Sequence, residues 1–151
     1  MRIKIETPVA RDMKTVFAGF TQDLFDALIP PEVPVKLLRF DGSRTGDEVH
    51  LELSFIFFKQ KWISVITDDG ESEDECFFVD EGRTLPFFLK FWRHRHRILR
   101  APDGGDGAVI VDDIEYRAPI PGMGLILYPI LRRQFKARGP IYQRIFGKPA
   151  Q

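Results

Sequence analysis

The stretch from Leu85 to Tyr116 constrains the fold most, because it holds two alternating segments joined by a glycine-rich turn. In the first segment the even positions from 92 to 98 fall on one face of a strand, and the three arginines between them fall on the other. Positions 110 to 116 alternate in the same way, and the residues PDGGDG between the segments supply turn chemistry. The pattern predicts a long β-hairpin.

The charges of this hairpin predict how its two strands pair. A register that sets opposite charges across from each other on the exposed face also places His96 beside Asp112 on the inward face. A slip of one residue would turn every inward side chain outward, so the alternation fixes the faces strongly. We expect a hydrogen bond between His96 and Asp112. The expected ion pairs on the outer face are Arg95–Asp113 and Arg93–Glu115.

Composition narrows the class of protein. The 22 basic and 22 acidic residues cancel, so no global field attracts nucleic acid or an anionic membrane. The single cysteine, Cys76, excludes a disulfide within the chain, and no apolar run approaches the roughly 20 residues of a membrane span. We expect one domain over residues 1–151, located in the cytoplasm, without nucleic-acid partners or stable membrane insertion. The 14 phenylalanines indicate a bulky core or the lining of an apolar cavity.

The remaining chain reads as further strands between two helical regions. Apolar residues at helical spacing predict a helix that begins after the N-cap Asp12, ends at Pro30 and is broken near residues 19–21. A basic amphipathic helix follows residues 122–124, with Pro129 as a kink and Gly139-Pro140 as a break before a short turn at residues 141–146. The predicted strands are Arg2–Glu6, Val35–Phe40, Glu48–Phe58, Trp62–Thr67 and Cys76–Asp80, the last two joined by an acidic turn at residues 68–75.

This order of elements predicts an α+β fold. A strand, a helical segment and about six antiparallel strands precede the long C-terminal helix, and only a strongly curved sheet lets one helix cover so much inward apolar surface. A curved antiparallel sheet wrapped around the C-terminal helix leaves a cavity between them, which is a natural site for a small molecule.

Four motifs carry a family resemblance, and they cover mainly the C-terminal half of the chain. The motifs are Pro86-Phe87, Trp92-Arg93-His94-Arg95-His96, Asp112-Asp113-Ile114-Glu115-Tyr116 with Pro119, and Gly122-Met123-Gly124 before the basic helix. Together they resemble the helix-grip superfamily of START, Bet v 1-like and polyketide cyclase-like proteins, and more closely its small bacterial SRPBCC members. The chain departs from that pattern at Leu85, where a glycine is commoner, and at Gly139-Pro140, which interrupts the last helix.

The resemblance implies a fold more sharply than a function, because this scaffold serves lipid carriers, hormone receptors and cyclases. Our leading hypothesis is a non-enzymatic binder or carrier of a small hydrophobic molecule. The alternative is a cyclase- or hydratase-type enzyme in which His96 and Asp112 act on a similar ligand. The residues that we expect at the ligand are Phe55, Phe57, Trp92, His94, His96, Asp112, Ile114, Tyr116, Leu127 and Leu131.

Two further readings of the polar residues compete with simpler ones. His94, His96 and Asp112 form a candidate metal triad, but a hydrogen bond between His96 and Asp112 satisfies the same groups without an ion, so we expect no metal and no cofactor. The basic face of the C-terminal helix suits anionic lipid head groups, whereas a solvated helix face is the commoner meaning of such charge.

Overall fold

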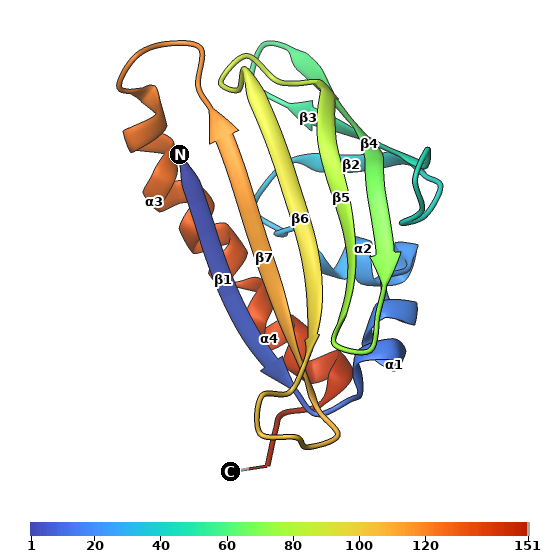
Figure 1. Ribbon diagram of the computed structural model, residues 1–151. Helices are drawn as coiled ribbons and strands as arrows, with labels where there is room; N and C mark the ends of the chain where they lie inside the picture. The colour runs from blue at the N-terminus through green and yellow to red at the C-terminus, as the bar shows by residue number, and fades with distance from the viewer. Residues whose placement is uncertain (151) are drawn as a thin grey trace.

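The computed structural model describes residues 1–150, in which seven strands form one curved antiparallel sheet and four helices lie on one of its faces (Figure 1). The strand order across the sheet is β1-β7-β6-β5-β4-β3-β2. The strands are β1 (Arg2–Val9), β2 (Val35–Phe40), β3 (Glu48–Ser54), β4 (Lys59–Glu71), β5 (Glu75–Thr84), β6 (Phe91–Arg100) and β7 (Ala108–Arg117). The helices are α1 (Met13–Ala18), α2 (Gln22–Leu28), α3 (Met123–Lys136) and α4 (Arg138–Phe146).

The β6–β7 hairpin has the predicted faces and the predicted register. Arg95 lies across from Asp113, and His96 lies across from Asp112. On the inner face, the β6 residues at positions 92, 94, 96 and 98 are all buried, and so are the β7 residues at 110, 112, 114 and 116. The first strand begins at Phe91 rather than Leu85, because residues 85–90 form the connection from β5.

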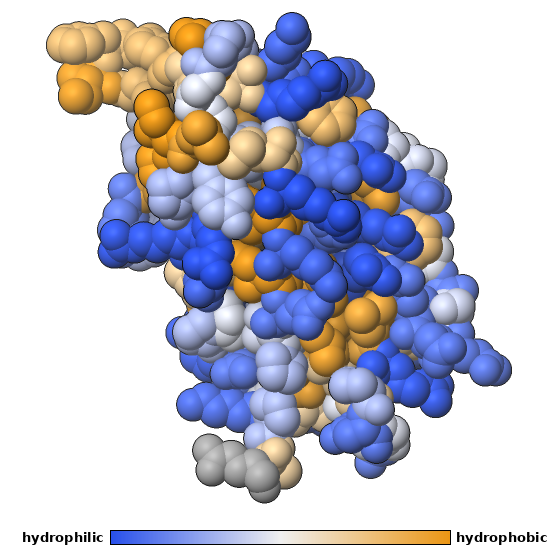
Figure 2. Space-filling model, turned by 60° about the vertical axis from the view of Figure 1, so that its left-hand side comes forward, coloured by the Kyte–Doolittle hydropathy of each residue, from blue (hydrophilic) through white to orange (hydrophobic). Residues whose placement is uncertain are grey.

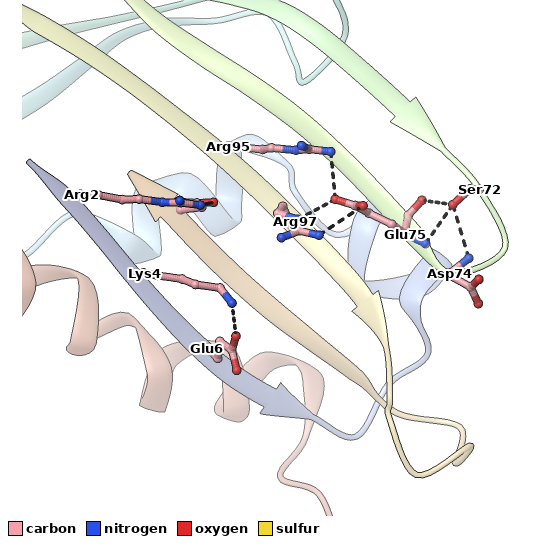
Figure 3. Close-up of polar contacts among 9 residues, drawn as sticks. Arg2, Lys4, Glu6, Ser72, Asp74, Glu75, Arg95 and Arg97 are labelled. Carbon is pink, nitrogen blue, oxygen red and sulfur yellow. Dashed lines mark hydrogen bonds and ion pairs between the residues drawn. The ribbon is translucent and has the colours of Figure 1, made fainter. Parts of the chain in front are cut away.

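The ion pairs predicted for the outer face are wrong, although their residues do lie across from each other. β6 and β7 each have a second neighbour in the sheet, β5 and β1, and the charged side chains pair with that neighbour instead. Figure 3 shows Arg95 and Arg97 of β6 reaching across to Glu75 of β5. The observed pairs are Arg93–Glu81 at 3.2 Å, Arg95–Glu75 at 3.1 Å and Arg2–Asp113 at 2.6 Å.

Several strand ends differ from the sequence-based prediction. β1 continues through Pro8 to Val9, which is possible because β1 is an edge strand and its open side needs no N–H donor at proline. β3 ends at Ser54, and residues 55–58 form the turn into β4, closed by a hydrogen bond from the Phe55 N–H to the Phe58 carbonyl oxygen at 2.7 Å. The apolar run of residues 55–58 imitates a strand but forms the tip of a hairpin.

The acidic turn between β4 and β5 is also shorter than predicted. Residues 68–71 still belong to β4, and β5 starts at Glu75. Two of the acidic side chains are held by one guanidinium group, since Arg44 lies 3.0 Å from both Asp69 and Glu71. The acidic residues therefore extend the strand instead of forming a loose loop.

The predicted break in the first helical region is confirmed. Asp12 caps α1 by accepting a hydrogen bond from the Thr15 backbone N–H at 3.0 Å, and α2 begins at Gln22. Gly19 stands between the two helices, where a Cβ atom would lie 2.6 Å from the ring of Phe146 in α4. A larger residue would therefore push the two helical regions of the chain apart.

The C-terminal helical region changes direction at Ala137 rather than at Gly139-Pro140. Pro140 lies in the first turn of α4, where its missing N–H costs no helical hydrogen bond, so residues 138–146 form a helix instead of the predicted short turn. Pro129 lies inside α3.

Helices α3 and α4 pack on the part of the sheet formed by β1, β7 and β6 (Figure 1). Ile3, Ile114 and Tyr116 form one buried cluster with Leu131 and Phe135 of α3. A second cluster joins the lower ends of β6 and β7 to α1, α2 and α4. The strands on the other side of the sheet, β2 to β5, are left with an inner face that these clusters do not fill.

Candidate functional site

A cavity of about 380 Å³ lies between the inner face of β2 to β6 and helices α2 and α3. Most of its wall is aromatic or aliphatic, from residues such as Leu24, Phe25, Val49, Trp62, Phe78 and Leu131. Its polar side chains are those of Thr21, Ser43, Ser64, Asp80, His94, His96, Gln134 and Arg138. A mainly apolar wall with a few polar groups is typical of a small-molecule site.

The structure brings together half of the predicted ligand-binding residues. Five residues from β6 and α3 line the cavity, namely Trp92, His94, His96, Leu127 and Leu131. The other five lie outside the lining of the cavity that the described residues form, namely Phe55, Phe57, Asp112, Ile114 and Tyr116.

The other five residues lie outside the cavity for two reasons. Those on β7 do point inward, as predicted, but α3 and α4 cover that strand, so Tyr116 donates a hydrogen bond to the Gly124 carbonyl oxygen and Ile114 lies in the core. Phe55 and Phe57 belong to the turn after β3, where the side chain of Phe57 is 94% exposed and Phe55 stacks on Phe58.

This turn belongs to an exposed apolar end of the molecule. Figure 2 shows hydrophobic side chains gathered at the upper end, the end at which Figure 1 places the β3–β4 turn and the start of α3. The exposed apolar residues there are Ile56, Phe57, Phe58, Phe87, Ile120, Leu125 and Ile126. None of the helices in residues 1–150 is long and apolar enough to cross a membrane.

Two histidines and two aspartates form a buried cluster at the cavity wall. The predicted His96–Asp112 hydrogen bond is wrong, since His96 Nδ1 lies 4.0 Å from Asp112 Oδ1. Instead, His94 Nε2 lies 2.9 Å from Asp112 Oδ1, and His96 Nε2 lies 2.9 Å from Asp80 Oδ2. The two imidazole rings lie against each other with centroids 3.5 Å apart. Side chains of a strand lean along its direction, so the residue directly opposite is not always the nearest partner.

The two carboxylates of the cluster have further partners. Trp92 Nε1 donates a hydrogen bond to Asp80 Oδ1 at 3.1 Å. Arg138 Nη1 of α4 lies 3.7 Å from Asp112 Oδ1. The cluster is therefore held on four elements of the fold: β5, β6, β7 and α4.

Burial and the neighbouring groups shift the pKa values of the cluster. Burial alone raises the pKa of Asp80 and of Asp112, but the hydrogen bonds and charges of the surrounding groups outweigh it and hold both pKa values below the ordinary 3.8. Burial, followed by the neighbouring His94, lowers the pKa of His96 from 6.5 to about 4. The carboxylates are therefore charged and His96 is neutral at pH 7.

Asp80 is the polar residue of this wall that the sequence analysis missed. It falls at the end of a predicted strand, on the same alternating face as Cys76 and Phe78, and that alternation is the signal that places it inward. Its donor atom lies within 4.8 Å of donor atoms of His94 and His96, which makes these three residues the group that could hold a metal ion.

Neither a family model nor a curated protein sequence matches the chain. Solved structures do match it in fold. A truncated norcoclaurine synthase from Thalictrum flavum has 15% sequence identity and a TM-score of 0.66, over 99% of this chain and 95% of that chain. An aromatase/cyclase from a Streptomyces species has 15% identity and a TM-score of 0.60, over 96% and 95% of the two chains. For Ara h 8.0201 the identity is 12% and the TM-score 0.58, over 95% and 98%.

These similarities span nearly the whole length of each chain at low sequence identity, and they agree with the curved sheet, the early short helices and the bent C-terminal helical region. The fold expected from the sequence motifs is confirmed: the protein has the helix-grip fold of the SRPBCC and Bet v 1-like proteins.

Proposed function

We propose that the protein binds and carries a small, largely apolar molecule in the cavity between the sheet and helices α2 and α3. The observation that supports this most is the cavity itself, about 380 Å³ in volume, with a mainly aromatic and aliphatic wall and a few polar groups, among them Asp80, His94 and His96. That volume lies at the small end of the range of roughly 300–1,000 Å³ found for small-molecule sites.

The wall also suggests how the molecule lies. Aromatic rings such as Trp62 and Phe78 offer apolar contact area, and burying that area against the ligand supplies most of the binding free energy. Asp80 and His96 offer a place for one polar group of the ligand, because an isolated polar group would lose free energy in an otherwise apolar cavity. The class of ligand that fits is an aromatic or lipid-like molecule with one polar end.

The proposal is tested by filling the cavity. Leu51 lines the cavity from β3, whereas the next residue, Glu52, carries its ion pair with Lys59. Leu51→Trp should weaken the binding of an apolar fluorescent dye at least about tenfold, and Glu52→Trp, which adds the same side chain to the same strand, should leave it unchanged. Native mass spectrometry of the freshly purified protein should show a co-purified compound. Equal dye binding by both variants would refute the proposal.

A second candidate function is chemical conversion of the same class of molecule by a cyclase- or hydratase-type enzyme. The observation that favours it is the position of the Asp80–His96 pair in the cavity wall, within reach of a bound molecule. Turnover separates the two functions: a carrier returns the co-purified compound unchanged, while an enzyme releases a product of different mass. Loss of that product in His96→Gln, with dye binding retained, would assign the pair to the reaction.

A further inference from the structure

We infer that Asp80, His94 and His96 bind one divalent transition-metal ion in the wall of the cavity. The donor atoms are a carboxylate oxygen of β5 and one ring nitrogen from each histidine of β6, and all three lie within 4.8 Å of one another. Two imidazole nitrogens and one carboxylate oxygen are a donor set of zinc and of non-haem iron sites. All three residues line the cavity, so the remaining coordination positions of the ion would face it.

The hydrogen bonding of His94 leaves its other nitrogen next to a carboxylate, where a cation can bind. Its Nε2 atom lies 2.9 Å from Asp112 Oδ1, so the N–H on this nitrogen donates to that carboxylate. Its Nδ1 atom lies 3.5 Å from Asp80 Oδ2, so a neutral imidazole would place a nitrogen lone pair against a carboxylate oxygen. A metal ion between Nδ1 and Oδ2 turns this repulsion into coordination.

The second histidine has one nitrogen near Asp80 and another that is buried on the side of Asp112. Within residues 1–150, His96 Nδ1 is buried and makes no hydrogen bond. With Nε2 on a metal ion, Nδ1 carries the ring proton and directs it toward Asp112 Oδ1, 4.0 Å away. Each imidazole would then present one nitrogen to the ion, and the N–H of His94 would donate to Asp112.

The groups behind the three ligands have the arrangement that metal sites use. Histidine ligands of metals almost always donate their other N–H to a carboxylate or a carbonyl oxygen, and carboxylate ligands are themselves hydrogen-bonded. Asp112 supplies that carboxylate for His94, and Trp92 Nε1 donates to Asp80 Oδ1 at 3.1 Å. Asp112 on β7 and Trp92 on β6 therefore orient the donor atoms of His94 and Asp80.

The charge of the cluster also favours a bound metal ion. Asp80 and Asp112 place two carboxylates in the cluster, and Arg138, 3.7 Å from Asp112, is the one guanidinium paired with either of them in residues 1–150. Buried charges need compensation, and a divalent ion supplies it. The sequence-based expectation of no metal rested on a His96–Asp112 hydrogen bond that the structure does not contain.

The inference concerns the ion alone and stands whether or not an apolar molecule binds. The purified chain is stripped with a chelator and dialysed against Zn²⁺ or Co²⁺. We expect one ion per chain by elemental analysis, a visible Co²⁺ absorption of nitrogen and oxygen coordination, and a Zn²⁺-dependent rise in the melting temperature. Less than about 0.2 ions per chain with a tenfold excess of either metal would overturn the inference, whatever the dye-binding result.

Single substitutions locate the ion. Asp80→Asn, His94→Gln and His96→Gln should each weaken Co²⁺ binding at least about 100-fold, and Asp112→Asn roughly 10- to 100-fold through the orientation of His94. The matched control is His50→Gln, which changes the third histidine of the chain, on β3 and outside the cluster, and should bind Co²⁺ as the wild type does. Circular dichroism identifies any variant that fails to fold. Folded cluster variants with wild-type Co²⁺ affinity, or a loss confined to His50→Gln, would overturn the assignment.

Discussion

The carboxylate of Asp112 accepts a hydrogen bond from His94 at 2.9 Å, although the residue directly across from it on β6 is His96. The pairing of the backbones and the pairing of the polar side chains are therefore offset by one inward position. Because both residues are almost completely buried, each would leave an unsatisfied polar group if its partner were removed.

This offset predicts which residues are coupled in stability. Asp112→Ala and His94→Ala should each lower the free energy of unfolding by about 1–3 kcal/mol, and the double variant should lose less than the sum, because the two share one interaction. Urea unfolding with a chelator present measures the cycle. Asp113→Ala is the control on the outer face, where its partner Arg2 is exposed, and should cost about 0–1 kcal/mol. Additive effects of His94 and Asp112 would contradict the pairing.

Trp92 should matter more for ligand binding than its neighbour Arg93. Trp92 is buried and lines the cavity, whereas Arg93 lies on the outer face and pairs with Glu81. Trp92→Ala should weaken the binding of an apolar dye at least about tenfold and Arg93→Ala by less than about twofold, as measured by fluorescence titration. Trp92→Phe, which retains an aromatic ring, should fall between them. Equal losses for the two alanine variants would be inconsistent with this cavity.

Phe57 should be neutral for the cavity although the sequence pattern assigned it there. Its side chain is 94% exposed at the tip of the β3–β4 hairpin. Phe57→Ser should therefore change the free energy of unfolding by less than about 0.5 kcal/mol and leave dye affinity unaltered. A large loss of dye affinity would mean that the exposed apolar end takes part in binding.

As the pH falls, the fold should lose stability first because of His96 and only at lower pH because the carboxylates are protonated. The pKa of His96 is lowered from 6.5 to about 4 in the folded state, so between these values the unfolded chain binds a proton that the folded chain does not. The free energy of unfolding should fall as the pH drops through this window, by up to about 3 kcal/mol. The pKa values of Asp80 and Asp112 are lowered too, so their stabilisation is present above pH 3.8 and is lost as the pH falls through their lower folded values.

The pH dependence is measured by urea unfolding between pH 8 and pH 4 with a chelator present, because a bound ion would compete with the proton for the imidazole. His96→Gln should flatten the slope between pH 6.5 and about pH 4, and His50→Gln should keep it. An unchanged slope in His96→Gln would exclude His96 as its source.

Gly19→Ala should weaken the packing between the N-terminal and C-terminal helical regions. The new methyl group would lie 2.6 Å from the Phe146 ring, so one of the two helices must move, and the expected cost is about 1–3 kcal/mol in thermal or urea unfolding. Gly139→Ala is the matched control, because a Cβ atom there meets Thr7 at an ordinary 3.5 Å and alanine favours a helix. It should be neutral or slightly stabilising. Equal losses at both positions would contradict the close contact at Gly19.

The sequence predicted the faces of the central hairpin because alternation is a local pattern. The register is also as predicted, although the ion pairs that suggested it do not form. It could not predict where strands end when an apolar run continues into a turn, as at residues 55–58, since hydrophobicity alone does not distinguish a buried strand from an exposed tip. The same limit explains why β1 was predicted to stop before Pro8: edge strands tolerate proline, and sequence alone does not show which strand is at the edge.

The candidate site was predicted only in part because it depends on contacts between different strands. Residues on β7 and residues on β6 have the same inward pattern, and only the position of α3 shows that Tyr116 is covered while Trp92 reaches the cavity. Asp80 was missed because its partner His96 lies 16 residues away on the next strand, and no local spacing reports such a pair. The residue types of the polar cluster were visible in the sequence, but their partners were not.

The pairing of β1 with β7 also sets an order of events during synthesis. Residues 2–9 pair with residues 108–115, so β1 cannot form its pairing until β7 has been made. At about 5–20 residues per second, the ribosome takes on the order of ten seconds to supply that partner. The nascent chain therefore carries β1 unpaired until residues 108–115 have been made, and a fragment that stops before residue 108 would expose both that strand and the open side of β6 to other chains.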